Sequence, residues 1–187
     1  MGERMIVRQT SIEGVSVIET TAFEDHRGSF ARFFCADDLA TILGSRRIVQ
    51  INHSRTSKTG AVRGIHFQHP PNAEMKLVRC LRGRVFDVAL DLRKNSPTFL
   101  QWHAEELDPC TAKMLVIPEG CAHGFQALQE ESEMLYLHTH FYHPESEGGL
   151  RPTDPALGIN WPLPVEDLSV RDNNHPLITS TYTGVSL

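Results

Sequence analysis

The sequence lacks the features that define several large protein classes. Its apolar residues form no run near the roughly 18 residues that a transmembrane helix needs, and no apolar signal region follows Met1. Basic residues are outnumbered, since 18 Lys and Arg face 23 Asp and Glu and the formal net charge is -5. That charge argues against a general nucleic-acid binder. The four cysteines form no C-x-x-C pair. We therefore expect a cytoplasmic protein with reduced thiols and with neither a membrane nor a nucleic acid as a partner.

The length and composition fit one globular domain. A chain of 187 residues can bury a sizeable core without disulfides or metals. Its 40% hydrophobic and 22% charged residues are ordinary for such a domain. Prolines become frequent after Pro144. We expect a single domain over residues 1–187, with its core at about 45–145 and an irregular C-terminal wrap at about 146–187.

Short β-rich segments separated by turns make up most of the chain. Residues 85–92 alternate with a period of two, which predicts a strand with one buried face. One short helix is expected over Ala36–Leu43, ended by Gly44. The pattern predicts an all-β sandwich or barrel with a few short helices. The expected strands are Arg47–Asn52, Ala61–Gln68, Met75–Leu92 with a turn at Arg82-Gly83, Phe99–Leu107, Lys113–Ile117, His123–Leu128 and Met134–Phe141.

Two segments, residues 60–68 and 118–124, each deliver a histidine to a predicted strand. Together they resemble the two cupin motifs, which hold a divalent metal through histidines and a glutamate. Here His66 is followed by Gln68 where the motif normally has a second histidine. Two histidines and a glutamine are a poor transition-metal set. We therefore expect no metal, which leaves His66 and His123 free for proton transfer. The ordinary alternative for each is a satisfied core or edge histidine.

Alternation over residues 134–142 places Tyr136, His138, His140 and Tyr142 on one face of a strand. A polar, aromatic face suits a barrel strand that lines a ligand cavity. A solvent-facing surface explains the same pattern equally well. The pair His138 and His140 could also bind a metal, but no further ligands have fitting local spacing.

Several basic residues lie near these segments. Scattered, they would be surface charges; gathered in one pocket, they would bind a diphosphate, because guanidinium groups match phosphate oxygens. Strict alternation puts Arg63 and His66 on opposite faces, unless the strand begins or bulges between them. The residues concerned are Arg27, Arg32, Arg63, Lys76 and Arg171.

Seven motifs stand in order along the chain, at residues 23–30, 50–54, 63–68, 76–79, 86–93, 117–125 and 154–162. Through them, from about Thr21 to Asp172, the chain resembles the dTDP-4-dehydrorhamnose 3,5-epimerases of nucleotide-sugar biosynthesis. The resemblance implies a metal-free jelly-roll cupin that forms a homodimer, needs no cofactor and acts on a nucleoside-diphosphate 4-keto-6-deoxy sugar.

The resemblance also implies catalytic roles. His66 matches the base that removes a proton beside the keto group, and Tyr136 matches the acid on the opposite face. Asp172 is the candidate partner that orients His66, and Lys76, helped by Arg63, would stabilise the enolate. An imidazole with a pKa of about 6.5 is a suitable base, and a tyrosine with a pKa of about 10 is protonated at rest.

The same resemblance implies a binding set near the nucleotide. In two of its motifs the chain departs from the family, with Arg32 in place of a usual glutamate and Ile51 in place of a usual aspartate. These departures predict an altered substrate preference, and Arg32 reaches the site only through a bulge or a pocket shared between subunits. The implied binding residues are Arg27, Arg32, Gln50, Asn52, Arg63, His123, Tyr142, Glu147 and Arg171.

Three alternative functions stay open. The first is a mono-epimerase on a different nucleotide-linked keto sugar, for example one linked to CDP. The second is a metal-dependent cupin enzyme, and the third is a carbohydrate-binding jelly roll. A binding module has no need of a matched base and acid, so the set of His66, Tyr136 and Asp172 argues against the third.

Overall fold

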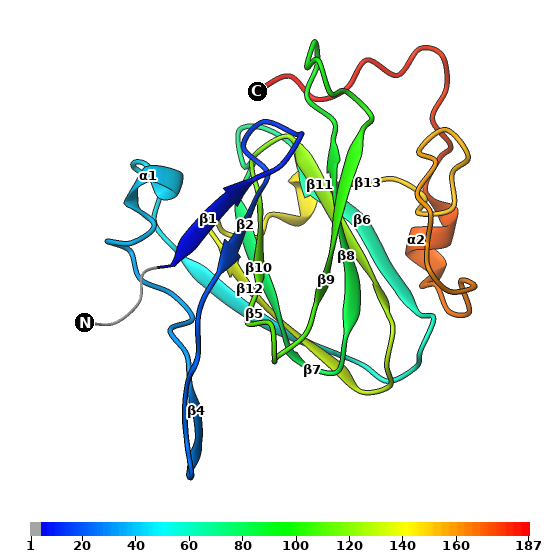
Figure 1. The fold of residues 1–187 in the computed structure, drawn as a ribbon. Helices are drawn as coiled ribbons and strands as arrows, with labels where there is room; N and C mark the ends of the chain where they lie inside the picture. The colour runs from blue at the N-terminus through cyan, green and yellow to red at the C-terminus, as the bar shows by residue number, and fades with distance from the viewer. Residues whose placement is uncertain (1–4) are drawn as a thin grey trace.

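The computed structural model describes residues 5–187, which form two large antiparallel β-sheets and a separate two-stranded hairpin (Figure 1). Two short helices, α1 (Ala40–Leu43) and α2 (Val170–Asn174), and the 3-10 turn η1 (Pro144–Ser146) lie around them. No helix among residues 5–187 combines the length and apolarity needed to cross a membrane. The strands are β1 (Ile6–Gln9), β2 (Ser16–Glu19), β3 (Phe23–Asp25), β4 (Gly28–Phe30), β5 (Gln50–Thr56), β6 (Val62–Gln68), β7 (Lys76–Arg82), β8 (Val85–Asp91), β9 (Trp102–Leu107), β10 (Met114–Ile117), β11 (Cys121–Ala127), β12 (Ser132–His138) and β13 (Glu147–Gly149).

The two sheets face each other across a shared core, which gives the expected all-β, cupin-type jelly roll. One sheet has the order β1-β2-β10-β7-β12-β5 and the other has the order β13-β6-β11-β8-β9. Val78 and Met134 of the first sheet belong to the same buried cluster as Val85, Ala89 and Phe125 of the second. The two sheets extend beyond the core segment expected at about 45–145. They include β1 and β2, which precede residue 45, and β13, which follows residue 145.

The C-terminal segment covers the outer face of the five-stranded sheet. Leu90 and Leu92 of the β8 segment are buried there against Leu150, Leu157 and Val185. Both faces of β8 are therefore buried, so the expectation of a single buried face is wrong for this strand. Its outward residues are apolar because the wrap, rather than water, lies against them. α2 is the helical part of this wrap and lies beside β6 (Figure 1).

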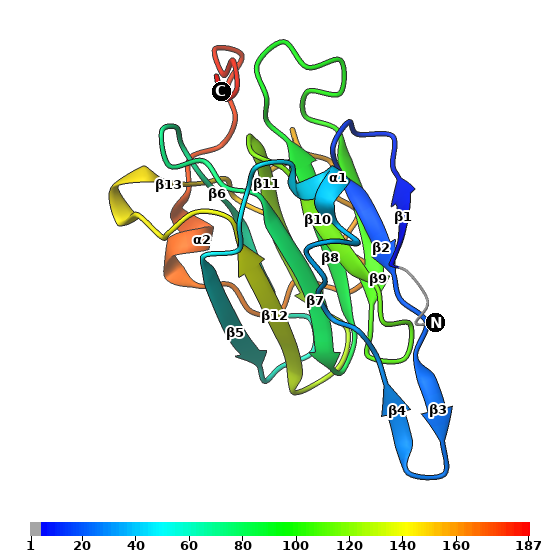
Figure 2. The ribbon, with the colours of Figure 1, turned by 90° about the vertical axis from the view of Figure 1, so that its left-hand side faces the viewer.

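The β3–β4 hairpin projects away from the body of the protein (Figure 2). Phe23 and Phe30 face each other across it and are 52% and 72% exposed. The following helix is shorter than expected, since α1 begins at Ala40 rather than at Ala36. The preceding residues form turns in which Leu39 packs into the core.

One extra residue in β6 changes which side chains face the interior. His66 pairs with His123 of β11, but the next pair joins Gly64 to Gly124, so Ile65 has no partner in β11. Ile65 instead exchanges backbone hydrogen bonds with Leu150. The bulge adds one residue to the alternation of the strand. Two residues on either side of it, which strict alternation would place on opposite faces, therefore face the same way.

Glycine is required where the bulge meets β11. Gly64 has φ +120, and a Cβ there would lie 2.6 Å from the Cα of Gly124. We expect Gly64→Ala to lower the free energy of unfolding by at least about 1–3 kcal/mol, measured by urea unfolding. Gly158→Ala is the matched control, because its φ is also positive but its Cβ would meet open space. Equal losses in the two variants would contradict the close approach.

Candidate functional site

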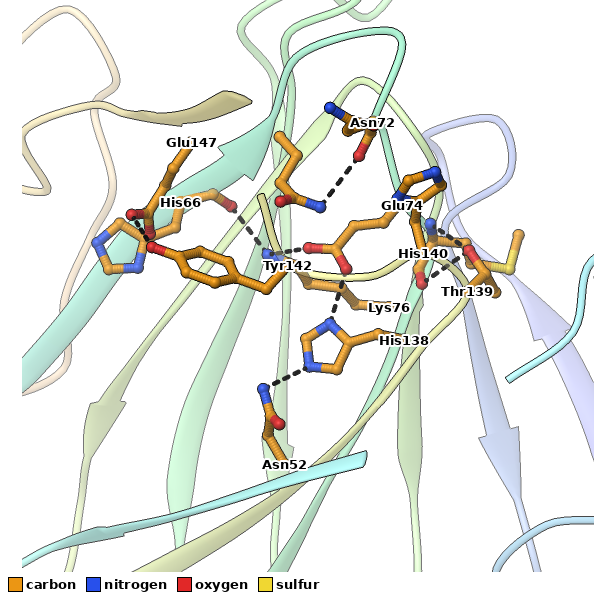
Figure 3. Close-up of polar contacts among 12 residues, drawn as sticks. Asn52, His66, Asn72, Glu74, Lys76, His138, Thr139, His140, Tyr142 and Glu147 are labelled. Carbon is orange, nitrogen blue, oxygen red and sulfur yellow. Dashed lines mark hydrogen bonds and ion pairs between the residues drawn. The ribbon is translucent and has the colours of Figure 1, made fainter. Parts of the chain in front are cut away.

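A cavity of about 1090 Å³ opens between the sheets and is lined by their strands and by α2. Its polar side chains come from both walls (Figure 3). β6 supplies Arg63 and His66, which the bulge described above turns into the same cavity. β12, in the opposite sheet, supplies Tyr136 and His138. The predicted residues that line the cavity are Gln50, Asn52, Arg63, His66, Lys76, His123, Tyr136, Tyr142, Glu147, Arg171 and Asp172.

His66 and Asp172 form a hydrogen-bonded pair. The distance from His66 Nε2 to Asp172 Oδ1 is 2.6 Å. Ser169 caps α2 by accepting a hydrogen bond from the Asp172 N–H, and the Gly64 N–H donates to the other carboxylate oxygen. Burial raises the pKa of Asp172, but the hydrogen bond and charge of His66 outweigh it and the pKa falls to about 2. The ionised carboxylate fixes the proton on Nε2, which leaves Nδ1 of His66 as the basic nitrogen.

Tyr136 lies on the wall opposite His66. Its hydroxyl is 2.8 Å from Ser54 Oγ on the neighbouring strand β5. Burial raises the pKa of Tyr136 above its ordinary value, although the Ser54 hydrogen bond works in the other direction. The phenol is therefore protonated at neutral pH and can donate a proton.

His123 forms a second histidine–carboxylate pair, with Asp87. Their Nε2 and Oδ1 atoms are 2.8 Å apart, and burial raises the pKa of the enclosed Asp87. The His123 ring stands edge-on to Tyr136, with ring centroids 6.0 Å apart. Sequence reasoning missed Asp87, because alternation places it on the face of β8 that carries two aspartates, opposite the uniformly apolar face that was expected to be the buried one.

Lys76 lies beside His66, at the start of β7. Its Nζ is 3.3 Å from Glu74 Oε1 and donates at 3.5 Å to the backbone carbonyl oxygen of His66 (Figure 3). Arg63 donates to Thr56 Oγ1 and to the Arg55 carbonyl oxygen, which holds it along β5. The site thus combines a histidine and a tyrosine on opposite walls with two cations.

Tyr142, Glu147 and Arg171 form a chain of contacts at the mouth of the cavity. The Tyr142 hydroxyl and Arg171 Nη1 each donate to Glu147 Oε2 at 2.8 Å. Arg171 Nη2 also lies 3.0 Å from His66 Nε2, but both are N–H donors once Nε2 carries its proton, so the acceptor that they share is Asp172 Oδ1, 3.6 Å from Arg171 Nε. Because Arg171 is half-exposed, it is accessible to an anion entering from solvent.

Arg27 and Arg32 lie outside the cavity of the described chain. Arg27 pairs with Asp25 in the exposed β3–β4 hairpin. Arg32 pairs with Asp38 at 2.8 Å, between that hairpin and α1. Ile51 lines the edge of the cavity on β5 and is 61% exposed. The structure therefore does not bring the two arginines to the site within one chain.

The predicted metal-ligand positions are engaged in protein contacts. Gln68 donates to the backbone oxygens of Asn72 and Phe141 and accepts from the His143 N–H. His138 does not pair with His140, because β12 ends at His138 and its Nδ1 contacts Glu74 instead.

Among residues 5–187, His66, Asp172 and His175 form the one group with ligand atoms close enough to hold a metal. Arg171 Nη2 lies 3.0 Å from the ligand nitrogen of His66. A guanidinium so close to the group repels a dication, so the group fits a metal poorly.

Comparison with known proteins identifies close relatives. The sequence model of the dTDP-4-dehydrorhamnose 3,5-epimerase family matches residues 9–180. The dTDP-4-dehydrorhamnose 3,5-epimerase of Salmonella typhimurium is 45% identical over 93% of this chain and 96% of its own. The dTDP-4-dehydrorhamnose 3-epimerase of Streptomyces niveus is 40% identical over 93% of this chain and 84% of its own. The structure of a dTDP-6-deoxy-D-glucose-3,5-epimerase of Legionella pneumophila in complex with dTDP-4-keto-L-rhamnose superposes with a TM-score of 0.88, at 40% identity and 93% coverage of each chain.

The raised pKa of Tyr136 predicts a late titration. Because burial opposes the charged phenolate, its folded-state pKa lies above the ordinary value of about 10. The measurement is the absorbance at 295 nm of the unchanged protein minus that of Tyr136→Phe, followed as the pH is raised. We expect this difference to develop only above pH 10. A difference transition with its midpoint at or below that of free tyrosine amide would contradict the burial of this hydroxyl.

Proposed function

This chain belongs to the dTDP-4-dehydrorhamnose 3,5-epimerase family, and we propose that its cavity converts dTDP-4-dehydro-6-deoxyglucose to dTDP-4-dehydrorhamnose by inverting carbons 3 and 5. The protein is a carbohydrate epimerase, an isomerase. One observation carries the proposal for this cavity: His66 and Tyr136 line it from opposite sheets. Inversion needs a base on one face of the sugar and an acid on the other.

The proposed step moves one proton off the sugar and another onto it. The 4-keto group acidifies the hydrogen on an adjacent carbon, and Nδ1 of His66 accepts that proton. The C–H electron pair forms the enolate, whose oxygen Lys76 stabilises. Tyr136 then donates its phenolic proton to the opposite face of the same carbon. Transfer of the proton from His66 to solvent and reprotonation of Tyr136 complete the cycle.

The nucleotide would lie towards the mouth of the cavity. Arg171, half-exposed and 2.8 Å from Glu147, is suited to exchange this carboxylate for a phosphate oxygen. Arg63 and His123 are further donors for the diphosphate. Tyr142 is 50% exposed and offers a ring for the base to stack on. The remaining proposed contacts are Gln50, Asn52 and Glu147.

We propose a homodimer in which the β3–β4 hairpin of one subunit reaches the site of its partner. The exposed Phe23 and Phe30 support this arrangement, because apolar side chains on a projecting hairpin gain stability when a partner covers them. It would also bring Arg27 and Arg32 to a substrate that they do not approach in their own chain. The altered substrate preference predicted for Arg32 and Ile51 then concerns a shared pocket.

A 3-mono-epimerase is the second candidate, since the Streptomyces niveus relative is named for inversion at carbon 3 alone. Both candidates use the same base and acid, so they differ in which carbon exchanges its hydrogen. We further propose that the reaction needs no metal, because Gln68 is committed to backbone partners. The four free thiols support a reducing, cytoplasmic location.

The proposal is tested by incubating dTDP-4-dehydro-6-deoxyglucose with the protein in heavy water. We expect NMR to show deuterium entering at carbons 3 and 5 together with inversion; deuterium at carbon 3 alone would identify the mono-epimerase. His66→Asn should slow exchange by at least about 10²–10⁴-fold. Tyr136→Phe should retain exchange but lose inversion, because protons then return from the face that they left. No exchange with the unchanged protein would overturn the proposal.

Subunit exchange tests the shared pocket. Arg27→Ala impairs the hairpin and His66→Asn impairs the cavity, so either homodimer should be weakly active. Random mixing gives heterodimers with one intact site, built from the cavity of one chain and the hairpin of the other, and should restore about a quarter of full activity. A mixture no more active than the mean of its components would show that the hairpin serves its own chain. Light scattering of each sample checks the oligomeric state.

A further inference from the structure

A buried carboxylate lies beside Lys76, and the proposed reaction does not use it. Glu74, just before β7, is 8% exposed and lines the cavity. Its Oε1 is 3.3 Å from Lys76 Nζ and its Oε2 is 2.8 Å from His138 Nδ1 (Figure 3). Both carboxylate oxygens therefore have charged or polar partners. Burial alone would raise the pKa of Glu74. Its contacts with His138 and Lys76 lower that pKa by more than burial raises it, so the carboxylate is ionised.

A second layer holds this carboxylate in place. His138 is 8% exposed and its Nε2 lies 3.3 Å from Asn52 Nδ2. The amide nitrogen of Asn52 is a donor, so Nε2 accepts and Nδ1 carries the proton that is donated to Glu74. A continuous series of contacts thus runs from β5 through β12 to the start of β7, where Lys76 begins the strand.

Lys76 is therefore anchored at two points. One is Glu74, and the other is the backbone carbonyl oxygen of His66, the proposed base. An ammonium group has three N–H donors, so one remains for a ligand in the cavity. A lysine side chain has four rotatable bonds, and without such anchors its charge would occupy many positions. The two contacts fix that charge relative to the base.

We propose that Glu74 is a positioning residue for Lys76, and that His138 and Asn52 hold Glu74 in the geometry that makes this possible. The inference rests on the proposed function, in which Lys76 meets the enolate oxygen. It assigns the His138–Glu74–Lys76 series a role in catalysis without contact with the reacting carbon. A fixed cation stabilises developing charge better than a mobile one, because it need not reorganise during the step.

Glu74→Ala is the direct test, with deuterium exchange of the keto sugar and dTDP affinity measured on the same samples. We expect the exchange rate at saturating substrate to fall by up to about 100-fold, the loss associated with misplacement of a catalytic group by about 1 Å. Affinity for dTDP, which lacks the ketone, should stay unchanged. Collapse of the cavity would instead weaken both. His140→Ala is the control, since His140 follows the same strand, does not line the cavity and contacts Phe141 and His143.

Two further variants separate positioning from other roles. Glu74→Gln should recover at least about tenfold of the loss, because its amide oxygen can accept from Lys76 and its amide nitrogen can donate to His138 in the other tautomer. In a Lys76→Met background, Glu74→Ala should have no additional effect, since Glu74 acts only through Lys76. The same loss in both backgrounds, or a change below twofold from Glu74→Ala alone, would overturn the inference. If the unchanged protein catalysed no deuterium exchange, that result would instead overturn the proposed function on which the inference rests.

Discussion

The hydrogen bond between His66 and Asp172 is the contact on which the site depends. It joins β6 to α2, and the two residues are separated by 106 positions in the chain. The contact forms only if the C-terminal wrap folds back over the five-stranded sheet. The bulge in β6 serves the same contact twice: it turns His66 inward, and it places the Gly64 N–H beside the second carboxylate oxygen. Backbone irregularity, rather than regular strand pairing, thus positions His66.

The strands from β5 to β12 were predictable, because a period of two and the intervening turns are local signals. The strands β1 to β4 and β13 fall in none of the expected segments, because they are only three or four residues long and carry no such period. β8 and its neighbours lie close to the expected segments. The two buried faces of β8 were not predictable, since the wrap that covers its outer face begins about 60 residues later in the chain. The early start expected for α1 also fails, because packing of Leu39 into the core fixes turns before the helix.

The site residues likewise divide into those that local sequence patterns predict and those that depend on contacts distant in the chain. Tyr136 and His138 share a face as alternation requires, but the rule stops where β12 ends, which is why His140 points elsewhere. The carboxylate partners Asp87 and Glu74 escaped sequence reasoning, because partner choice depends on the register between strands. No pattern within one chain could indicate whether a projecting hairpin serves its own site or that of a neighbour. Motif resemblance supplied roles that spacing alone could not.

Gln68 bears on what a metal site in this cavity would require. Where the cupin motif has a metal-binding imidazole, the amide of Gln68 joins β6 to the backbone at Asn72, Phe141 and His143. An imidazole at this position could not reproduce that set of donors and acceptors. Gln68→His would therefore leave backbone groups of the following loops without their partners. Building a metal site here would thus demand a rearranged backbone as well as a new ligand.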